Sequence, residues 1–332
     1  VVLGGVNDYI DRIIEAENIF ITACGTSWHA AQIGSYLLED ILHKPIKVEY
    51  ASEFRYRNNS VNEKSLVIAI SQSGETADTL SAVKKAKDKN ALTMGIVNVV
   101  GSSISRETNC GIYMHAGPEI GVASTKAFSC QVSILILFAV YLAQKSKACD
   151  LEELKKIAND LSTLPTIIDK ILKLNDKIFQ ISKEYIESHN FLYLGRGLQF
   201  PVALEGALKL KEISYIHAEG YPAGELKHGP LAIVDDAMPV VAVAPNNITL
   251  EKLKSNLEEV KARGGKLYIF ADKRAHFTDD AISKVFEIDA PDNPVAPILF
   301  TIPLQLLAYH CALIKGTDVD QPRNLAKSVT VE

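Results

Sequence analysis

Along this chain, short runs of consecutive apolar residues alternate with longer segments in which apolar and polar residues are mixed. The short apolar runs, rich in β-branched residues, predict strands, and the longer blocks between them have the apolar spacing of helices. The strands expected in the first part of the chain are Ile19–Cys24, Ile46–Tyr50, Ser65–Ile70, Ala91–Val97 and Gly111–His115. Because strands that alternate with helices form parallel sheets covered by those helices, we expect an α/β fold.

A long helical pattern follows the fifth predicted strand. It extends from Ser124 to about Ser188, and we expect it to be broken near Cys149 and Asp150 and again at Pro165. The first domain is therefore expected to comprise residues 1–164, the second residues 165–317, and a C-terminal tail residues 318–332.

The second part of the chain repeats the pattern of the first. Asn190–Gly197 resembles Asn18–Ser27, Tyr221–Leu226 resembles Tyr50–Phe54, and the strand predicted at Met238–Ala244 corresponds to Ser65–Ile70. The spacings agree, because Gly25 and Ser71 are 46 positions apart and Gly195 and Ala244 are 49 apart. Two copies of one α/β unit are the economical interpretation.

The predicted strand at Ser65–Ile70 ends in a cluster of small hydroxyl residues. Ser71, Gln72, Ser73 and Thr76 surround Gly74 where a helix should begin, an arrangement that suits a phosphate group. Ordinary helix capping is the alternative. The loop lacks the lysine of a nucleotide P-loop, so a monophosphate fits better than a di- or triphosphate.

The phosphate prediction applies only to the first copy. At the equivalent place the second copy has Ala244-Pro-Asn-Asn in place of the hydroxyls. Thr26 and Ser27, which follow the first predicted strand, should lie near the hydroxyl loop, because ligands of open parallel sheets bind beyond the carboxyl ends of the strands. For these two residues alone, a helix N-cap is the competing explanation.

A charged stripe marks the helix predicted at Pro201–Ile213. Glu205, Lys209 and Glu212 lie within an arc of about 60° at helical spacing. The opposite side is assigned Leu204, Ala207, Leu208 and Leu210, with Lys211 as an exception. Such a stripe is ordinarily solvated and held by i,i+4 pairs. The alternative is a carboxylate base beside a lysine, which suits proton transfer next to a carbonyl or imine.

Two further segments are rich in candidate chemistry. The segment from His217 to Pro230 combines turn residues with titratable ones, and its His228 can shuttle protons near neutral pH. The tail contains Pro322 and ends in apolar residues, which indicates docking against the body and a specific place for Lys327. A plain surface histidine and a frayed terminus are the alternatives.

Composition narrows the class of protein. The 332 residues are 47% hydrophobic and 23% charged, as in soluble globular proteins, and the net charge of −5 gives no general attraction for nucleic acid. Five widely spaced cysteines without a C-x-x-C pair indicate reduced thiols, and no metal site is expected. We interpret the apolar stretches 133–143 and 295–314 as buried helices rather than membrane spans, and we find no signal peptide. The cytoplasm is the expected location.

Together these motifs resemble the isomerase half of glutamine:fructose-6-phosphate amidotransferase, also called glucosamine-6-phosphate synthase. The matching segments, in order, are Cys24–Ser27, Ser71–Thr79, Gly121–Lys126, Leu204–Ser214, Gly224–Gly229 and Asp320–Glu332. The resemblance implies two tandem sugar isomerase (SIS) units, each a flavodoxin-like three-layer αβα sandwich with a parallel sheet. It covers nearly the whole chain and agrees with the internal repeat.

The resemblance also implies roles at the matching positions. The sugar 6-phosphate would be bound by Ser71, Gln72, Ser73 and Thr76, and the sugar by Thr26, Ser27, Val122, Ala123, Ser124 and Ala326. Glu212 resembles the base that moves a proton from C1 to C2 through an enolamine, supported by Lys209 and Glu205. Lys327 resembles the lysine that forms a Schiff base with the open-chain ketose, and His228 the residue that promotes ring opening.

Further expectations follow from the same resemblance. Whole enzymes of the family carry a glutaminase domain that supplies ammonia, whereas this sequence begins at Val1 just ahead of the first SIS unit, so no glutaminase activity is expected. No cofactor is expected either. A homodimer or higher assembly follows, because the histidine loop serves the neighbouring subunit in this family. Eukaryotic members are inhibited by UDP-N-acetylglucosamine, for which residues 101–108 are a candidate site, with a capped short helix as the alternative.

Two other functions remain open from the sequence. A non-catalytic SIS sensor would bind a sugar phosphate but would need neither the charged helix face nor Lys327. A plain aldose–ketose isomerase would share Glu212 and the phosphate loop but has no evident use for the tail.

Overall fold

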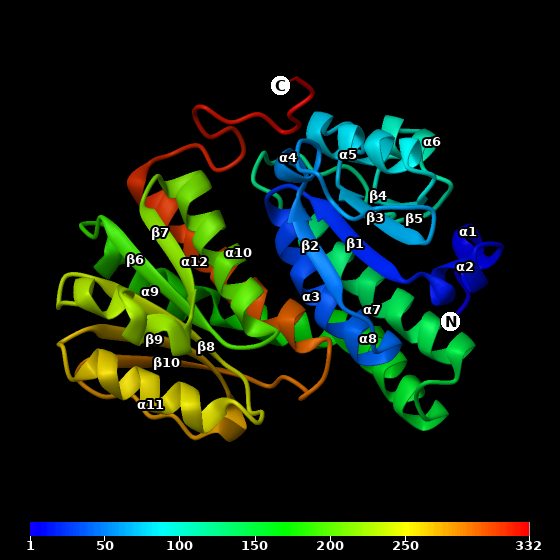
Figure 1. Cartoon of the computed structure of the whole chain (residues 1–332). Coiled ribbons are helices and arrows are strands. Elements are labelled where there is room, and N and C mark those ends of the chain that lie inside the picture. Colours follow the sequence, from blue (N-terminus) through cyan, green and yellow to red (C-terminus); the bar gives the residue numbers. More distant parts are fainter. Residues whose placement is uncertain (332) are drawn as a thin grey trace. The chain divides into compact units, whose positions relative to one another are not determined.

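The structure, a computed structural model, describes residues 1–331, which form two compact units. Unit 1 comprises Val1–Leu161 together with the tail from Ala326, and unit 2 comprises Ser162–Leu325. The domain limits expected from the sequence, 1–164, 165–317 and 318–332, remain a prediction. Glu332 lies outside the described residues. Figure 1 shows both units, each of which is a sheet flanked by helices.

Unit 1 contains one parallel sheet with the strand order β2-β1-β3-β4-β5. Its strands are β1 Asn18–Ala23, β2 Ile46–Tyr50, β3 Ser65–Ser71, β4 Leu92–Val97 and β5 Cys110–Tyr113. Its helices are α1 Gly4–Asn7, α2 Ile10–Glu15, α3 Thr26–Leu42, α4 Ala51–Phe54, α5 Ala77–Asp88, α6 Ser103–Glu107 and α7 Lys126–Ser146, followed by the first part of α8 Leu151–Ile171. All five strand predictions are confirmed, with ends that differ by at most two residues.

The uninterrupted apolar run of β3 has a simple cause. Helices cover both faces of the sheet, with α5 and α6 on one side and α3 and α7 on the other (Figure 1). Every residue of β3 is buried, and its Val67 packs in one cluster with Ala82 of α5. A strand buried on both faces has no reason to alternate apolar with polar residues.

Unit 2 contains a second parallel sheet, with the order β7-β6-β8-β9-β10. Its strands are β6 Asn190–Gly195, β7 His217–Pro222, β8 Pro239–Ala244, β9 Lys266–Asp272 and β10 Ser283–Ile288. Its helices are α9 Asn175–Ser182, α10 Gln199–Ser214, α11 Leu250–Lys261 and α12 Ala296–Lys315, with short 3-10 helices at Leu172–Leu174, Lys183–Tyr185, Ala223–His228, Pro230–Ile233 and Lys273–Ala275.

The two sheets are topological copies. Counted from its own first strand, each has the order 2-1-3-4-5 of flavodoxin-like folds. In unit 2 the side chains of β6 alternate between the faces: Leu192 packs in a cluster with Leu257 of α11, whereas Tyr193 lies against Gly206 of α10. The predicted α/β class and the internal repeat are confirmed.

One predicted helix break is wrong. The break near Cys149 and Asp150 exists, since α7 ends at Ser146 and α8 begins at Leu151, but α8 continues through Pro165 to Ile171. Proline costs a helix one hydrogen bond and strains the preceding turn. Burial of Leu164 and Ile171 on the apolar side of α8 outweighs that local loss.

The two apolar stretches lie within long helices, as predicted. Helices α7 and α12 are long and apolar enough to cross a membrane by length and composition. In each, however, 67% of the most apolar window is buried in the protein. Helix α7 packs on α3, and α12 packs on α9 and α10, so both serve as core helices.

Candidate functional site

The hydroxyl loop of unit 1 is folded around its own side chains. Ser71 Oγ accepts a hydrogen bond from Gly74 N at 3.0 Å and lies 3.0 Å from Thr76 Oγ1. Ser73 Oγ accepts from Glu75 N at 3.1 Å. Thr76 occupies the N-cap position of α5, but its side chain makes no capping hydrogen bond. The hydroxyls are therefore gathered inside the loop rather than spent on capping the helix.

The backbone of this loop is fixed by its neighbours. The carbonyl of Gln72 accepts a hydrogen bond from Asn98 N, just beyond β4, at 3.3 Å. Gly74 adopts a φ of +68°, and a Cβ added there would lie 2.0 Å from Ser102 Oγ and 2.5 Å from its Cβ. Only glycine fits this turn without moving Ser102.

Replacing Gly74 with alanine is therefore expected to disrupt the loop. The positive φ should cost about 1–2 kcal/mol, and the contact with Ser102 adds to that cost. The matched control is Gly101→Ala, because Gly101 has a φ of +73° but open space around the new Cβ. Calorimetric titration with inorganic phosphate and urea unfolding should show weaker binding and lower stability for Gly74→Ala than for Gly101→Ala. Equal results for both variants would contradict the packing argument.

Thr26 and Ser27 lie at the same edge of the sheet as the hydroxyl loop. They begin α3, directly after β1, and β1 pairs in parallel with β3. Both are nearly buried, with exposed fractions of 9% and 8%. Ser27 Oγ accepts a hydrogen bond from Gln131 Nε2 of α7 at 2.8 Å, which fixes the start of α3.

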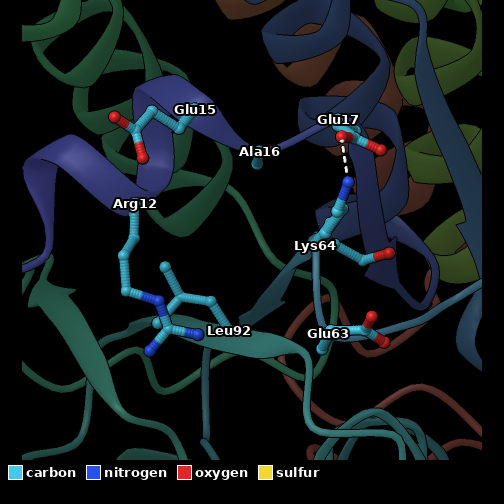
Figure 2. A pocket seen from close by; sticks show the side chains of 8 residues that line it. Arg12, Glu15, Ala16, Glu17, Glu63, Lys64 and Leu92 are labelled. Atoms are coloured by element: carbon cyan, nitrogen blue, oxygen red, sulfur yellow. Dashed lines mark hydrogen bonds and ion pairs between the residues drawn. The ribbon is translucent and has the colours of Figure 1, made fainter.

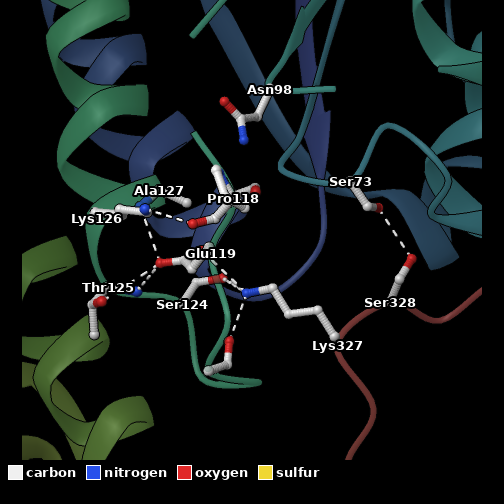
Figure 3. A network of polar contacts seen from close by, with 12 residues as sticks. Ser73, Asn98, Pro118, Glu119, Ser124, Thr125, Lys126, Ala127, Lys327 and Ser328 are labelled. Carbon is white, nitrogen blue, oxygen red and sulfur yellow. Dashed lines mark hydrogen bonds and ion pairs between the residues drawn. The ribbon is translucent and has the colours of Figure 1, made fainter. Parts of the chain in front are cut away.

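The tail residues from Ala326 pack on the rest of unit 1 through Lys327. Its Nζ lies 3.1 Å from Glu119 Oε2, 2.8 Å from the carbonyl of Gly121 and 3.4 Å from Ser124 Oγ (Figure 3). Ser124 belongs to the segment predicted to line the sugar site. The structure thus brings the predicted amine and one predicted sugar contact together. In the same segment Ala123 is buried and Val122 half-buried, whereas Ala326 is exposed.

Glu119 is a site residue that the sequence analysis missed. Its side chain is only 5% exposed, and its Oε1 accepts from the backbone N–H groups of Thr125 and Ala127 at 2.7 and 3.3 Å. Burial alone would raise the pKa of this carboxyl, but those N–H groups and the Lys327 ammonium outweigh it and lower the pKa. Glu119 therefore stays ionised and joins the start of α7 to the tail.

In unit 2 the charged face of α10 is buried. Lys209 Nζ lies 3.4 Å from Glu205 Oε1 and 2.5 Å from Glu212 Oε2. The side chains of Lys209 and Glu205 are 1% and 0% exposed, whereas that of Glu212 is 20% exposed. Burial lowers the pKa of Lys209, yet the two carboxylates outweigh this effect and raise it. Lys209 is thus a cation at neutral pH, and Glu212 is the one member of the three that reaches solvent.

This burial overturns the solvated-stripe interpretation of α10. The side assigned to the core is in part the more accessible one, because Leu204 and Leu208 are half-buried and Lys211 is exposed. Lys211, an exception in the sequence analysis, simply points away from the buried charges. The hydrophobic pattern alone misleads here, since the helix buries Glu205 and Lys209 as fully as Leu210.

His228 ends the 3-10 helix Ala223–His228 and is exposed. The next residue, Gly229, has a φ of +141°, a conformation that favours glycine. The histidine is therefore carried on a sharply turned, accessible part of unit 2.

A pocket of unit 1 lies at the opposite edge of its sheet. It is lined by residues at the beginnings of β1, β3 and β4, namely Glu17, Ser65 and Leu92, together with charged residues of α2 (Figure 2). Lys64 in its wall is paired with Glu17 at 2.7 Å. None of the predicted site residues lines this pocket. The hydroxyl loop follows the other ends of the strands.

Comparison with known proteins identifies both units. The SIS domain model matches residues 12–141 and 184–315. The chain is 54% identical, over its whole length, to glutamine–fructose-6-phosphate aminotransferase [isomerizing] of Bacteroides thetaiotaomicron, of which it covers 54%. It is 53% identical over 97% of its length to the Escherichia coli protein of that name, of which it covers 53%. The chain spans about half the length of these curated relatives.

Solved structures agree with the sequence relatives. The C-terminal domain of glucosamine-fructose-6-phosphate aminotransferase from Francisella tularensis superposes with a TM-score of 0.93 at 48% identity, covering 97% of this chain and 91% of that one. Tagatose-6-phosphate ketose/aldose isomerase from Escherichia coli shares the fold, with a TM-score of 0.73 at 17% identity over 96% and 90% of the two chains. The chain therefore belongs to the SIS domain family and, within it, to the C-terminal part of the glutamine–fructose-6-phosphate aminotransferases.

Proposed function

We propose that this chain is the isomerase half of glucosamine-6-phosphate synthase, converting fructose 6-phosphate and ammonia to glucosamine 6-phosphate. The observation that carries the proposal is the docking of the tail. The predicted Schiff-base amine, Lys327, lies at the Gly121–Ser124 segment, while the next residue, Ser328, contacts the predicted phosphate loop at Ser73. A sensor that only bound sugar phosphate would have no use for an amine in this position.

In this proposal, each step of the reaction is assigned to a particular side chain. Ser71, Ser73 and Thr76 offer their hydroxyl groups for phosphate. His228 promotes ring opening. The Lys327 ammonium, which lies 3.1 Å from Glu119 Oε2, first gives up a proton to solvent. The neutral amine then attacks C2 of the open-chain ketose to give an imine and water. Ammonia then replaces the lysine at C2.

The imine makes the C1 protons acidic enough for a carboxylate base. Glu212 takes a proton from C1, leaving an enolamine, and returns it to C2, so that the aldose amine forms without a net change in oxidation state. The buried Lys209 ammonium, held by Glu205, keeps a positive charge 2.5 Å from the Glu212 carboxylate.

The proposal extends to partners of the whole protein. Ammonia would come from glutamine through a glutaminase domain, which is separate from the two SIS units. The exposed position of His228 fits a homodimer in which the histidine serves the neighbouring subunit.

UDP-N-acetylglucosamine as an inhibitor at residues 101–108 is the weaker extension. Thr108 Oγ1 already donates to the Ile104 carbonyl at 3.0 Å, and Glu75 caps α6 at Ser103 N at 2.7 Å. These contacts favour the capped short helix, although the buried Ser102 hydroxyl has no hydrogen-bond partner among the described residues. Calorimetry with the nucleotide sugar, comparing the wild-type chain with Thr108→Ala, tests this extension.

Turnover of fructose 6-phosphate tests the proposed function. We expect glucose 6-phosphate without ammonia and glucosamine 6-phosphate with an ammonium salt, both measured enzymatically. Unphosphorylated fructose should react at least about 100-fold more slowly, since it lacks charge-assisted bonds worth about 1.5–3 kcal/mol each. Binding without any turnover would indicate the sensor, and isomerisation without amination would indicate a plain aldose–ketose isomerase.

A further inference from the structure

The tail contacts unit 1 through three consecutive residues. Lys327 binds the Glu119–Ser124 segment, Ser328 Oγ donates to Ser73 Oγ at 3.1 Å, and the carbonyl of Val329 accepts from Ala77 N at 3.0 Å. Figure 3 shows the side chains of Lys327 and Ser328 extending from the same stretch of the tail to these two different parts of unit 1. The tail therefore joins the predicted sugar segment, the predicted phosphate loop and the first N–H of α5.

Ser328 adds a hydroxyl to the phosphate loop from a distant part of the sequence. Its partner Ser73 already accepts a hydrogen bond from Glu75 N. The single O–H donor of Ser328 is thus hydrogen-bonded to a neutral hydroxyl group. A phosphate oxygen is a much stronger acceptor, because hydrogen bonds to an ionised group are shorter and about twice as strong.

We propose that Ser328 is an additional phosphate-binding residue and that it determines specificity for phosphorylated sugars. The inference rests on the proposed function of this loop. When phosphate occupies the loop, the Ser328 donor turns from Ser73 to a phosphate oxygen. Because Lys327 is the adjacent residue, the same contact fixes the amine on which Schiff-base formation depends.

This arrangement couples phosphate binding to the position of the tail. If phosphate binding favours the ordered tail, then the ordered tail must favour phosphate binding by the same factor, because coupling free energies are reciprocal. A purely structural Ser328 would act differently. Its loss would loosen the tail equally for every sugar, because the Lys327 and Val329 contacts with unit 1 do not involve phosphate.

Borohydride trapping of the imine at Lys327 separates these two roles. The rate of trapping is measured by mass spectrometry with fructose 6-phosphate and with fructose. We expect Ser328→Ala to lower the ratio of the two rates by about tenfold and Ser328→Thr, which keeps the hydroxyl, to restore most of it. The matched control is Thr330→Ala, a nearby exposed tail hydroxyl, which should keep the wild-type ratio.

A second measurement does not depend on imine chemistry. Inorganic phosphate should protect the amides of residues 326–331 from hydrogen exchange in the wild-type chain, and Ser328→Ala should lose this protection and bind phosphate about tenfold more weakly in calorimetry. An unchanged trapping ratio, or equal phosphate affinity in both proteins, overturns the role of Ser328. Absence of trapping at Lys327 in the wild-type chain instead contradicts the proposed function, and the phosphate titration then still decides the role of Ser328.

Discussion

Replacing Glu212 with glutamine is expected to lower the rate of fructose 6-phosphate isomerisation by about 10²- to 10⁴-fold, the usual contribution of a positioned acid–base group. Glutamine keeps the shape of the side chain but cannot accept a proton from C1. Glu212 is suited to this role because its carboxylate is partly accessible, whereas its partners Lys209 and Glu205 are buried. Initial rates at saturating substrate measure the effect.

The Glu212 experiment needs evidence that the rest of the site survives. Affinity for inorganic phosphate should stay within about twofold of wild type, because the phosphate loop belongs to the other unit. The matched control is Glu259→Gln, a partly exposed glutamate paired with Lys227 at 3.0 Å, which should keep its activity. A Glu212→Gln protein with more than a tenth of wild-type activity would rule out Glu212 as the base.

Replacing Lys209 with methionine should cause the largest loss of stability. The change removes the ammonium group that lies 3.4 Å from the fully buried Glu205 carboxylate. Removing one partner of a buried ion pair typically costs about 3–5 kcal/mol, because the remaining charge is buried and uncompensated. Urea unfolding at pH 7 should show this loss. Lys254→Met, which breaks the exposed pair with Glu251, should cost less than about 1 kcal/mol.

The pH dependence follows from the raised pKa of Lys209. A group whose pKa is higher in the folded than in the unfolded state stabilises the fold fully at pH values below its unfolded-state pKa, which is 10.5 for this lysine. This contribution is lost as the pH rises through the folded-state pKa. The wild-type chain should therefore lose this stabilisation only above pH 10.5. A loss of stability in Lys209→Met no larger than that of Lys254→Met would show that the ions are not effectively buried.

Much of the fold could be predicted from the sequence because its strands are buried on both faces. A run such as Leu66 to Ile70 is apolar throughout, and the loops after it are marked by glycine and hydroxyl residues. The hydroxyl loop was found for the same reason. The break at Pro165 was predicted wrongly, because a local rule about proline takes no account of the apolar side chains that hold α8 together.

The charges on α10 were harder to interpret. Spacing places Glu205, Lys209 and Glu212 on one face whether that face is solvated or buried, so the sequence left both alternatives open. Their burial depends on what packs against the helix. Glu119 was missed because its partner Lys327 is 208 positions away. The signal that could have found it is a carboxylate shortly before the start of a helix, a typical place for a residue that binds the free N–H groups.

The discontinuous composition of unit 1 has a consequence for its assembly. Residues 1–161 are completed by a segment that begins at Ala326, and the whole of unit 2 lies between them in the sequence. On the ribosome, the lysine that pairs with Glu119 is therefore made only after unit 2 has been synthesised. Cleavage of the chain between Leu325 and Lys327 would separate this part of unit 1 from residues 1–161 while sparing every strand of both sheets. Intact secondary structure is thus a poor measure of an intact protein, and the mass of the C-terminal peptide is the better one.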